Sequence, residues 1–268
     1  QLVVNDSTNY ELFFHYSFLQ RSLGDYQLAL NVINKALRLA ETDEWFQIKA
    51  AIAKGSLYFL SGENETALTE YESALKLSQK VGDKQNESKA MVDIGIILDM
   101  NGEVDKAREY FNKAIKISKG INDNENLAFA YSELGVSFSF TNELINAKEN
   151  YKRSYQIYKC LGNKMRLSFL SDNLGRIYLN IFDFKSALKY YNDGVEFAGD
   201  NKRALALNLT GIADVYSNLS NYSEALKYYR KAQEISSDIK EIDLSSLINS
   251  GLGILNFNLE RFSGSLQF

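Results

Sequence analysis

The chain has 268 residues, 45% of them hydrophobic and 24% charged, with a formal net charge of −4 and no proline at all. At the usual frequency of roughly 5%, about a dozen prolines would be expected, so the composition excludes proline-rich linkers and polyproline II ligand segments and disfavours a loop-rich β-sandwich. The acidic balance, without a basic stripe, disfavours direct binding of DNA or RNA. The single cysteine, Cys160, excludes an internal disulfide and a cysteine-rich zinc site.

Nothing in the sequence predicts a membrane segment. No apolar run approaches the roughly eighteen residues of a membrane span, and the start Gln1–Asp6 lacks a charged region followed by an apolar one. We therefore expect a soluble chain. Its compartment stays open, with the cytoplasm favoured and a periplasmic sensor domain as the alternative.

A repeat of 38 to 40 residues runs along the chain. Its most regular position is a small residue, at Ala29, Ala67, Ala107, Ala147, Ala187, Ala225 and Ser265. Twelve residues earlier stands a second small residue, at Gly55, Gly95, Gly135, Gly175, Ala213 and Gly253. Four residues after the first position comes an aromatic ring, at Tyr71, Phe111, Tyr151, Tyr191 and Tyr229. Two small–large pairs per repeat predict two packed helices, in which each small residue is a hole for a ring.

Apolar residues at three- and four-residue steps, such as Leu188, Tyr191 and Val195, share one helical face and support this prediction. Helix breakers separate the helices in chain order, at Leu23–Asp25, Ser61–Glu63, Gly82–Asp83, Asn101–Glu103, Asn122–Asp123, Gly162–Asn163 and Ser220–Tyr222. Glycine there is expected to end helices, and Asp or Asn to cap the next one. We expect one domain, 1–268, with six full repeats and a seventh that stops early in its second helix.

One repeat shows a family resemblance most clearly. Leu174-Gly175-x-x-Tyr178, followed by Phe182-Asp183-Phe184-x-x-Ala187-Leu188-x-x-Tyr191 and Gly194, resembles the tetratricopeptide repeat (TPR). The resemblance covers residues 8 to 268 and implies an all-α, right-handed α-α superhelix. The long period and the absent closing proline depart from the usual pattern. Longer repeats of this kind resemble those of kinesin light chains, of bacterial Rap-type peptide receptors and of bacterial TPR sensor and regulator domains.

Enzyme signatures are absent, so we predict no catalysis, no cofactor and no metal. One histidine, His15, excludes a two-histidine zinc helix, and the chain has neither a phosphate-binding glycine loop nor a nucleophile elbow. Asn122–Asn126 lacks the glycine of a calcium loop and is predicted to cap a helix. Six Asn-x-Ser/Thr triplets, among them Asn5 and Asn208, are attributed to a composition rich in asparagine.

In stacked helical pairs the first helices line an extended inner groove. Counting from the glycine of repeats three to six, the predicted ligand-binding residues are Asp93, Asp99, Glu133, Asp172, Asn173, Arg176, Asn180, Asp214 and Asn218. Five carboxylates against one cation predict an acidic groove lined with amides, suited to a basic or polar peptide. Two alternatives stay open. The carboxylates are merely solvated, or Asp172 pairs with Arg176 four residues later.

One feature of some relatives, a clamp that binds chaperone tails, is missing from this sequence. Relatives that bind chaperone tails carry a lysine and asparagine clamp on the first helices, whereas the equivalent positions here include Ile52, Val92, Ser56 and Ile96. We predict a protein- or peptide-binding module, the sensing or scaffolding region of a bacterial signalling or regulatory protein. The alternative is self-assembly, as a homo-oligomer formed through the uncapped C-terminal end or through Phe13–Phe14. A phosphatase-like role of the Rap kind ranks lower.

Overall fold

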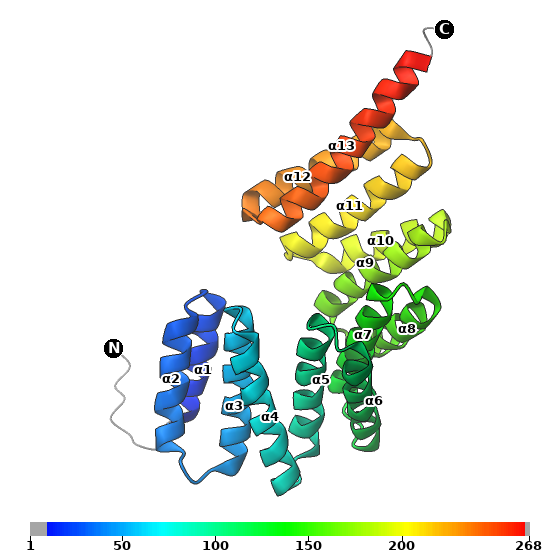
Figure 1. The fold of residues 1–268 in the computed structure, drawn as a ribbon. Coiled ribbons are helices and arrows are strands. Elements are labelled where there is room, and N and C mark those ends of the chain that lie inside the picture. The colour runs from blue at the N-terminus through cyan, green and yellow to red at the C-terminus, as the bar shows by residue number, and fades with distance from the viewer. Residues whose placement is uncertain (1–9, 266–268) are drawn as a thin grey trace. The chain divides into compact units, whose positions relative to one another are not determined.

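The computed structural model describes residues 10–265, and for 259–265 the backbone alone. Within this range the chain forms thirteen α-helices and no strand, which confirms the predicted all-α helical-repeat fold (Figure 1). The Asn-x-Ser triplet at Asn5 and the terminal residues Leu266–Phe268 lie outside the described residues. The helices fall into two compact units, Gln1–Ser137 and Phe138–Phe268.

The first unit holds six helices and most of a seventh, and each of the helices α1 to α5 packs on the next one along the chain (Figure 1). The first helices of neighbouring repeats, α3 and α5, also touch. The helices are α1 (Tyr10–Ser22), α2 (Tyr26–Leu39), α3 (Glu44–Leu60), α4 (Asn64–Val81), α5 (Lys84–Met100), α6 (Val104–Gly120) and α7 (Asn124–Phe140). The unit boundary falls in the last turn of α7.

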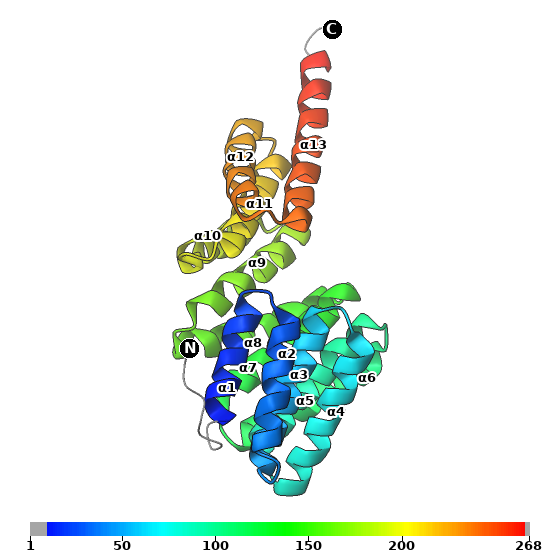
Figure 2. The ribbon, with the colours of Figure 1, turned by 90° about the vertical axis from the view of Figure 1, so that its left-hand side faces the viewer.

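The second unit continues the same alternation. In Figure 2, α13 stands alongside α11 and α12, and both contacts are present. The first helices α9, α11 and α13 therefore pack on one another in series. The helices are α8 (Leu144–Leu161), α9 (Lys164–Asn180), α10 (Phe184–Ala198), α11 (Lys202–Asn218), α12 (Tyr222–Ile239) and α13 (Ile242–Ser265).

The predicted pairing of small residues with rings is confirmed. A Cβ atom added to Gly55, Gly95 or Gly175 would lie 2.6 Å from the ring sixteen residues later, at Tyr71, Phe111 and Tyr191 respectively. Real Cβ atoms essentially never come so close, so only glycine admits the ring at these positions. The central alanines, such as Ala67, Ala107 and Ala187, are fully buried.

One glycine was assigned wrongly. Gly253, predicted to be a packed small position, has no atom within 4 Å of an added Cβ, whereas Gly251 has the ring of Tyr229 at 2.5 Å. Gly211 occupies the matching place two residues before Ala213, and it receives the ring of Tyr191. The rings therefore pack between two first helices, and the second contact, with the next repeat, is offset by two residues from the first.

The turns use the predicted chemistry. Gly82 and Gly162 end helices with left-handed backbone, at φ +79° and +69°, and Asp43 accepts a hydrogen bond from the Phe46 N–H to begin α3. The Asp123 carboxylate accepts from the Asn126 N–H, so the segment Asn122–Asn126 is a helix cap as expected. At Phe182 the same left-handed turn, with φ +59°, is made by an aromatic residue.

The predicted turn in the seventh repeat is wrong, because α13 runs unbroken from Ile242 to Ser265. Asp183 and Asn221 begin the second helices of their repeats by accepting a backbone N–H. Arg261 stands at the equivalent sequence position, and its side chain has no acceptor. Without an acceptor or a glycine, nothing there favours a turn over continued helix.

The N-terminal aromatic pair is part of the core of its unit. The Phe14 ring is buried and packs edge-on against Phe46 at 5.4 Å between ring centroids. The Lys35 ammonium lies 4.4 Å from the centroid of Phe13. Phe14 is therefore covered within its own unit and is not a free docking side chain.

Candidate functional site

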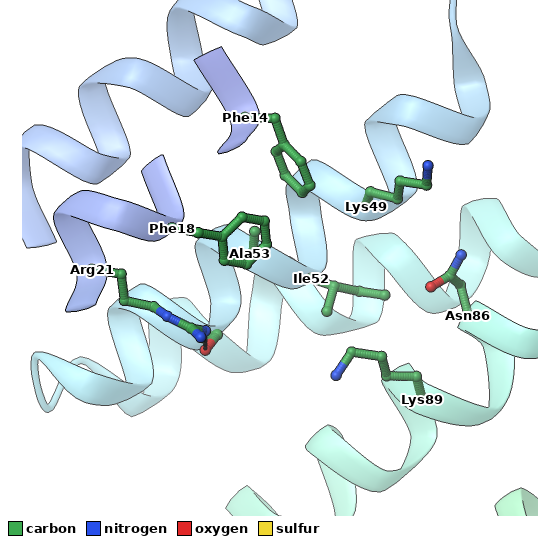
Figure 3. Close-up of a pocket in the computed structure, with 9 residues that line it drawn as sticks. Phe14, Phe18, Arg21, Lys49, Ile52, Ala53, Asn86 and Lys89 are labelled. Carbon is green, nitrogen blue, oxygen red and sulfur yellow. Dashed lines mark hydrogen bonds between the residues drawn. The ribbon is translucent and has the colours of Figure 1, made fainter. Parts of the chain in front are cut away.

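Three consecutive first helices of the first unit line one pocket of about 350 Å³. Figure 3 shows Phe14 and Phe18 of α1 on one side, Asn86 and Lys89 of α5 on the other, and Ile52 of α3 between them. Helix spacing brings these side chains together, because residues at one repeat position line up along stacked first helices. The pocket therefore combines an apolar wall with polar and charged groups.

The pocket carries three cations, one from each helix, at Arg21, Lys49 and Lys89. The Arg21 guanidinium lies 5.3 Å from the centroid of the Phe18 ring and donates to the Ser56 hydroxyl at 3.3 Å. These contacts with two uncharged side chains orient Arg21 without neutralising its positive charge.

One carboxylate lies close to this pocket. Asp93 is 3.6 Å from the Lys89 ammonium, one turn along α5. Burial raises the pKa of Asp93 above its usual value, and Lys89 opposes that rise. Burial also raises the pKa of the Tyr71 hydroxyl, and Asp93 raises it further. Asp93 therefore belongs to the packed layer beneath the first-helix surface.

The other two predicted residues of this unit are half-buried. Asp99 accepts a hydrogen bond from the Ser137 hydroxyl at 2.8 Å, and Arg108 of α6 donates to the same serine at 3.2 Å. Asp99 thus joins α5 to α7 within the unit. Glu133 lies on α7 and is half-buried.

In the second unit the predicted Asp172–Arg176 ion pair is confirmed, with 2.5 Å between the two side chains. The Asp172 side chain is 9% exposed and the Arg176 side chain 56%, so the carboxylate is buried and the guanidinium reaches solvent. The negative charge of Asp172 raises the pKa of Arg176 still further above neutrality. The pair neutralises Asp172 within its own helix.

Asp214 of α11 lies in the same electrostatic environment. Burial is the main cause that raises its pKa to about 6, and Asp172 adds to the rise, whereas Arg176 and a hydrogen bond donated by the Tyr229 hydroxyl oppose it. The structure thus brings Asp172, Arg176 and Asp214 together. The charges of all three also affect the pKa of the buried Tyr191 hydroxyl, and Asp214 raises that of Tyr229.

The three predicted amides occupy different places. Asn173 is half-buried on α9, and Asn180 and Asn218 are exposed at the C-terminal ends of α9 and α11. Asn218 donates to the backbone carbonyl of Asp214 at 2.8 Å. Asn180 and Asn218 are therefore accessible from solvent, and Asn173 partly so.

Sequence reasoning missed the cationic pocket because it counted groove residues only from repeat three onward. A signal was present in the sequence, since Lys49 and Lys89 both stand six residues before their repeat glycines, Gly55 and Gly95. Arg21 stands four residues after Ser17, the same repeat position that Asp99 occupies in repeat three. The recurrence of lysine at one repeat position is thus a sequence signal for two of the three pocket cations, and Arg21 comes from a different repeat position.

Other chemistry-bearing residues are dispersed. Among residues 10–265, no cluster of three His, Cys, Asp or Glu side chains has a geometry that could hold a metal ion. Cys160 and His15 are exposed. Asn208 is fully buried within α11, where it donates to the Ala204 carbonyl, so it is closed to glycosylation. In the described part of the chain, no helix has the length and apolar character needed to cross a bilayer.

Comparison with family models gives three matches. Tetratricopeptide-repeat models match residues 10–43 and 47–120, and the model of soluble NSF attachment protein, SNAP, matches residues 95–246. Among curated proteins, none matches the sequence significantly.

Solved structures share the fold at low sequence identity. The crystal structure of BtubC (BKLC) from P. vanneervenii matches with a TM-score of 0.67 and 18% identity, over 87% of this chain and 93% of that one. A Rap protein complexed with competence and sporulation factor matches with a TM-score of 0.69 and 13% identity, over 94% of this chain and 76% of that one. A STAND protein with a tetratricopeptide-repeat sensor from Pyrococcus horikoshii matches with a TM-score of 0.71 and 16% identity, over 91% of this chain and 40% of that one.

Proposed function

Because the chain belongs to the helical-repeat families described by the SNAP and tetratricopeptide-repeat models, we propose that it binds a protein or peptide segment on its first helices. The observation that carries this proposal is the pocket that α1, α3 and α5 line together. Consecutive first helices present side chains at a regular spacing, and an extended segment can contact several of them in turn.

The predicted residues divide into two roles under this proposal. Arg176, Asn180 and Asn218 are exposed and contact the ligand, with Asn173 beside them, since amides both donate to and accept from a peptide backbone. Asp172 and Asp214 are engaged with Arg176 and Tyr229 and hold the surface in shape. Asp99 and Glu133 are half-buried and supply negative charge to the first-helix surface of the first unit, whereas Asp93 lies in the packed layer beneath it.

We assign the chain to the sensing or scaffolding part of a bacterial signalling or regulatory protein, without catalysis of its own. The shared fold of the Rap protein solved with competence and sporulation factor, and of the STAND protein with a repeat sensor, supports this assignment. The partner follows from the surface chemistry and is a polar protein or peptide segment.

The test is selection of peptides from a displayed random library, followed by calorimetric titration of the selected peptides. Asn173→Ala and Asn180→Ala alter the first-helix surface, and Asn192→Ala on α10 is the matched control, since Asn192 is exposed on a second helix. We expect at least one surface variant to lose about tenfold in affinity, the effect of about one lost hydrogen bond. The proposal fails if no selected peptide binds saturably, or if the control loses as much.

A further inference from the structure

We propose that the second helices of the second unit carry a docking surface for an acidic protein segment, whose carboxylates pair with lysines and whose apolar side chains cover tyrosine rings. The inference goes beyond the proposed function, because this surface lies on α8, α10 and α12 and not on the first helices. We call it the lysine–tyrosine surface and define it by Lys148, Lys152, Lys189, Lys231, Tyr190 and Tyr228.

The charge of these helices is opposite to that of the whole chain. Their N-terminal parts, 144–153, 184–191 and 222–231, hold eight cations and two carboxylates, whereas the chain has a net charge of −4. Glu149 and Glu224 each pair with a cation of their own helix. In the part of the chain whose side chains are described, 10–258, no ion pair engages the other six cations, which are Lys148, Lys152, Lys185, Lys189, Arg230 and Lys231. Such a group of unpaired cations attracts an anionic partner.

Tyrosine rings bring lysines of two helices to one place. The ammonium groups of Lys148 and Lys152 on α8 lie 5.8 and 5.5 Å from the centroid of the Tyr178 ring. That ring stacks on Tyr190 of α10, with 5.3 Å between the ring centroids. The ammonium group of Lys189 lies 5.8 Å from the centroid of Tyr190. One pair of stacked rings thus holds three lysines.

The next repeat adds a second stacked pair. Tyr216 of α11 stacks on Tyr228 of α12 with 5.7 Å between the ring centroids, and the ammonium group of Lys231 lies 5.7 Å from the centroid of Tyr228. Tyr190 and Tyr228 pack against the same hydrophobic cluster of this unit. The lysine–tyrosine surface therefore extends from α8 to α12.

The lysines of α8 are oriented before a partner binds. Lys148 and Lys152 are half-buried, and a hydrogen bond with the Tyr178 hydroxyl raises the pKa of Lys152, so its ammonium group stays charged. Contact with a ring restricts a side chain that is otherwise flexible, and less conformational entropy is then lost when a carboxylate binds. A carboxylate therefore pairs with these lysines at a lower entropic cost than with freely moving ones.

The rings favour a protein over a nucleic acid as the partner. Tyr178 is 9% exposed, and Tyr190 and Tyr228 each stack on another tyrosine, whereas proteins that bind single strands stack bases on open aromatic faces. Half-buried tyrosines such as Tyr190 and Tyr228 instead suit a protein interface, where the ring contacts apolar side chains. The partner we infer is therefore an acidic segment with interspersed apolar residues.

The test is a titration followed by two-dimensional NMR, with a peptide of repeated Glu-Glu-Leu units as probe and a Gln-Gln-Leu peptide as its uncharged counterpart. We expect the acidic peptide to shift the signals of Lys189 and Tyr190 and to bind about tenfold more tightly than the uncharged one. Its affinity should fall as the salt concentration rises, because salt screens exposed charges. Oligothymidylate of equal charge should bind more weakly.

Variants assign the binding to this surface. Lys148→Gln combined with Lys152→Gln is expected to weaken binding of the acidic peptide about tenfold. Lys76→Gln combined with Lys80→Gln is the matched control, since these lysines are also four residues apart and are exposed on α4, a second helix of the first unit. Arginine at both positions of α8 should keep most of the affinity, because it keeps the charges. Thermal unfolding checks that each variant is folded.

Three results would overturn the proposal. The first is equal binding of the two peptides, or equal losses in the two glutamine double variants. The second is binding of oligothymidylate at least as tight as that of the acidic peptide. The third is a dimer in sedimentation that Lys148→Gln with Lys152→Gln dissociates, since a second copy would then occupy the surface. None of these results bears on peptides selected for the first helices, so the failure of either proposal is recognised separately.

Discussion

The ring of Tyr191 packs against the backbone of Gly175, where an added Cβ would lie 2.6 Å from the ring carbon Cε1. The same ring contacts Gly211 of the next repeat, so one side chain fills the space between α9, α10 and α11. Tyr191 is 1% exposed, and its hydroxyl has a raised pKa because of burial.

Substitution of Gly175 by alanine is expected to destabilise the protein by about 1–3 kcal/mol, because the added methyl overpacks a space already filled by the ring. Chemical denaturation monitored by circular dichroism measures the change. Gly253→Ala is the matched control, since Gly253 is also helical but has open space around it. It should be neutral or stabilising by up to about 1 kcal/mol through helix propensity. Equal destabilisation by both would contradict the ring-and-glycine packing.

Asp214 makes stability depend on pH. Its pKa of about 6 lies above the ordinary 3.8, so between these values the folded chain binds more protons than the unfolded chain, and its stabilising contribution is lost as the pH rises through 6. Asp172 strengthens this effect, whereas Arg176 and Tyr229 oppose it.

Asp214→Asn removes the charge but keeps an oxygen that can accept from Tyr229. We expect wild type and variant to be similarly stable near pH 4, and the variant to be more stable by about 1–3 kcal/mol above pH 7. Denaturant titrations across this range measure the difference. Asp200→Asn, in an exposed turn, should give a difference that does not change with pH, and the same flat profile for Asp214→Asn would refute the burial argument.

The Asp172–Arg176 pair is expected to contribute modestly. A double-mutant cycle with Asp172→Asn and Arg176→Met should give a coupling energy of about 0.5–1 kcal/mol, since solvent screens the guanidinium, 56% exposed, despite the buried carboxylate. A coupling energy near zero at low salt would show that the pair does not contribute to the fold.

Phe182 occupies a turn that glycine makes elsewhere. Its φ of +59° is unfavourable for a residue with a Cβ, and the residue is 73% exposed. Phe182→Gly should therefore stabilise the second unit by about 1 kcal/mol. Asn142→Gly, at the same repeat position, should gain less because asparagine tolerates this backbone. A loss of stability in Phe182→Gly would mean that the edge contact with Phe184 outweighs the strain.

Periodicity was sufficient to predict the helices and turns of the first six repeats and the Gly175–Tyr191 contact, because all three depend on residues within one repeat. The Asp172–Arg176 pair was also foreseeable, since residues four apart share a helical face. Contacts between repeats were not, because the two-residue offset that selects Gly211 and Gly251 depends on how neighbouring helices rotate against each other.

The burial of charged groups could not be predicted from the sequence either. Asp214 was counted with the solvent-facing carboxylates, but the Tyr229 hydroxyl from α12 covers it. The cationic pocket needs three helices from three repeats to be placed together before Arg21, Lys49 and Lys89 become one site. The sequence gives the position of each such residue on its own helix, but only the packing of the helices shows that they line one pocket.

The position of Tyr191 between two glycines has a consequence for cooperativity. Unfolding of the fifth repeat exposes the ring of Tyr191, which the sixth repeat also covers. The contacts of this ring with α9 and with α11 are therefore lost together. Adjacent repeats in this unit should therefore unfold together, in the manner of nearest-neighbour coupling in repeat proteins. Amide hydrogens of α9 and α11 should then exchange with solvent at matched rates, as members of a single foldon.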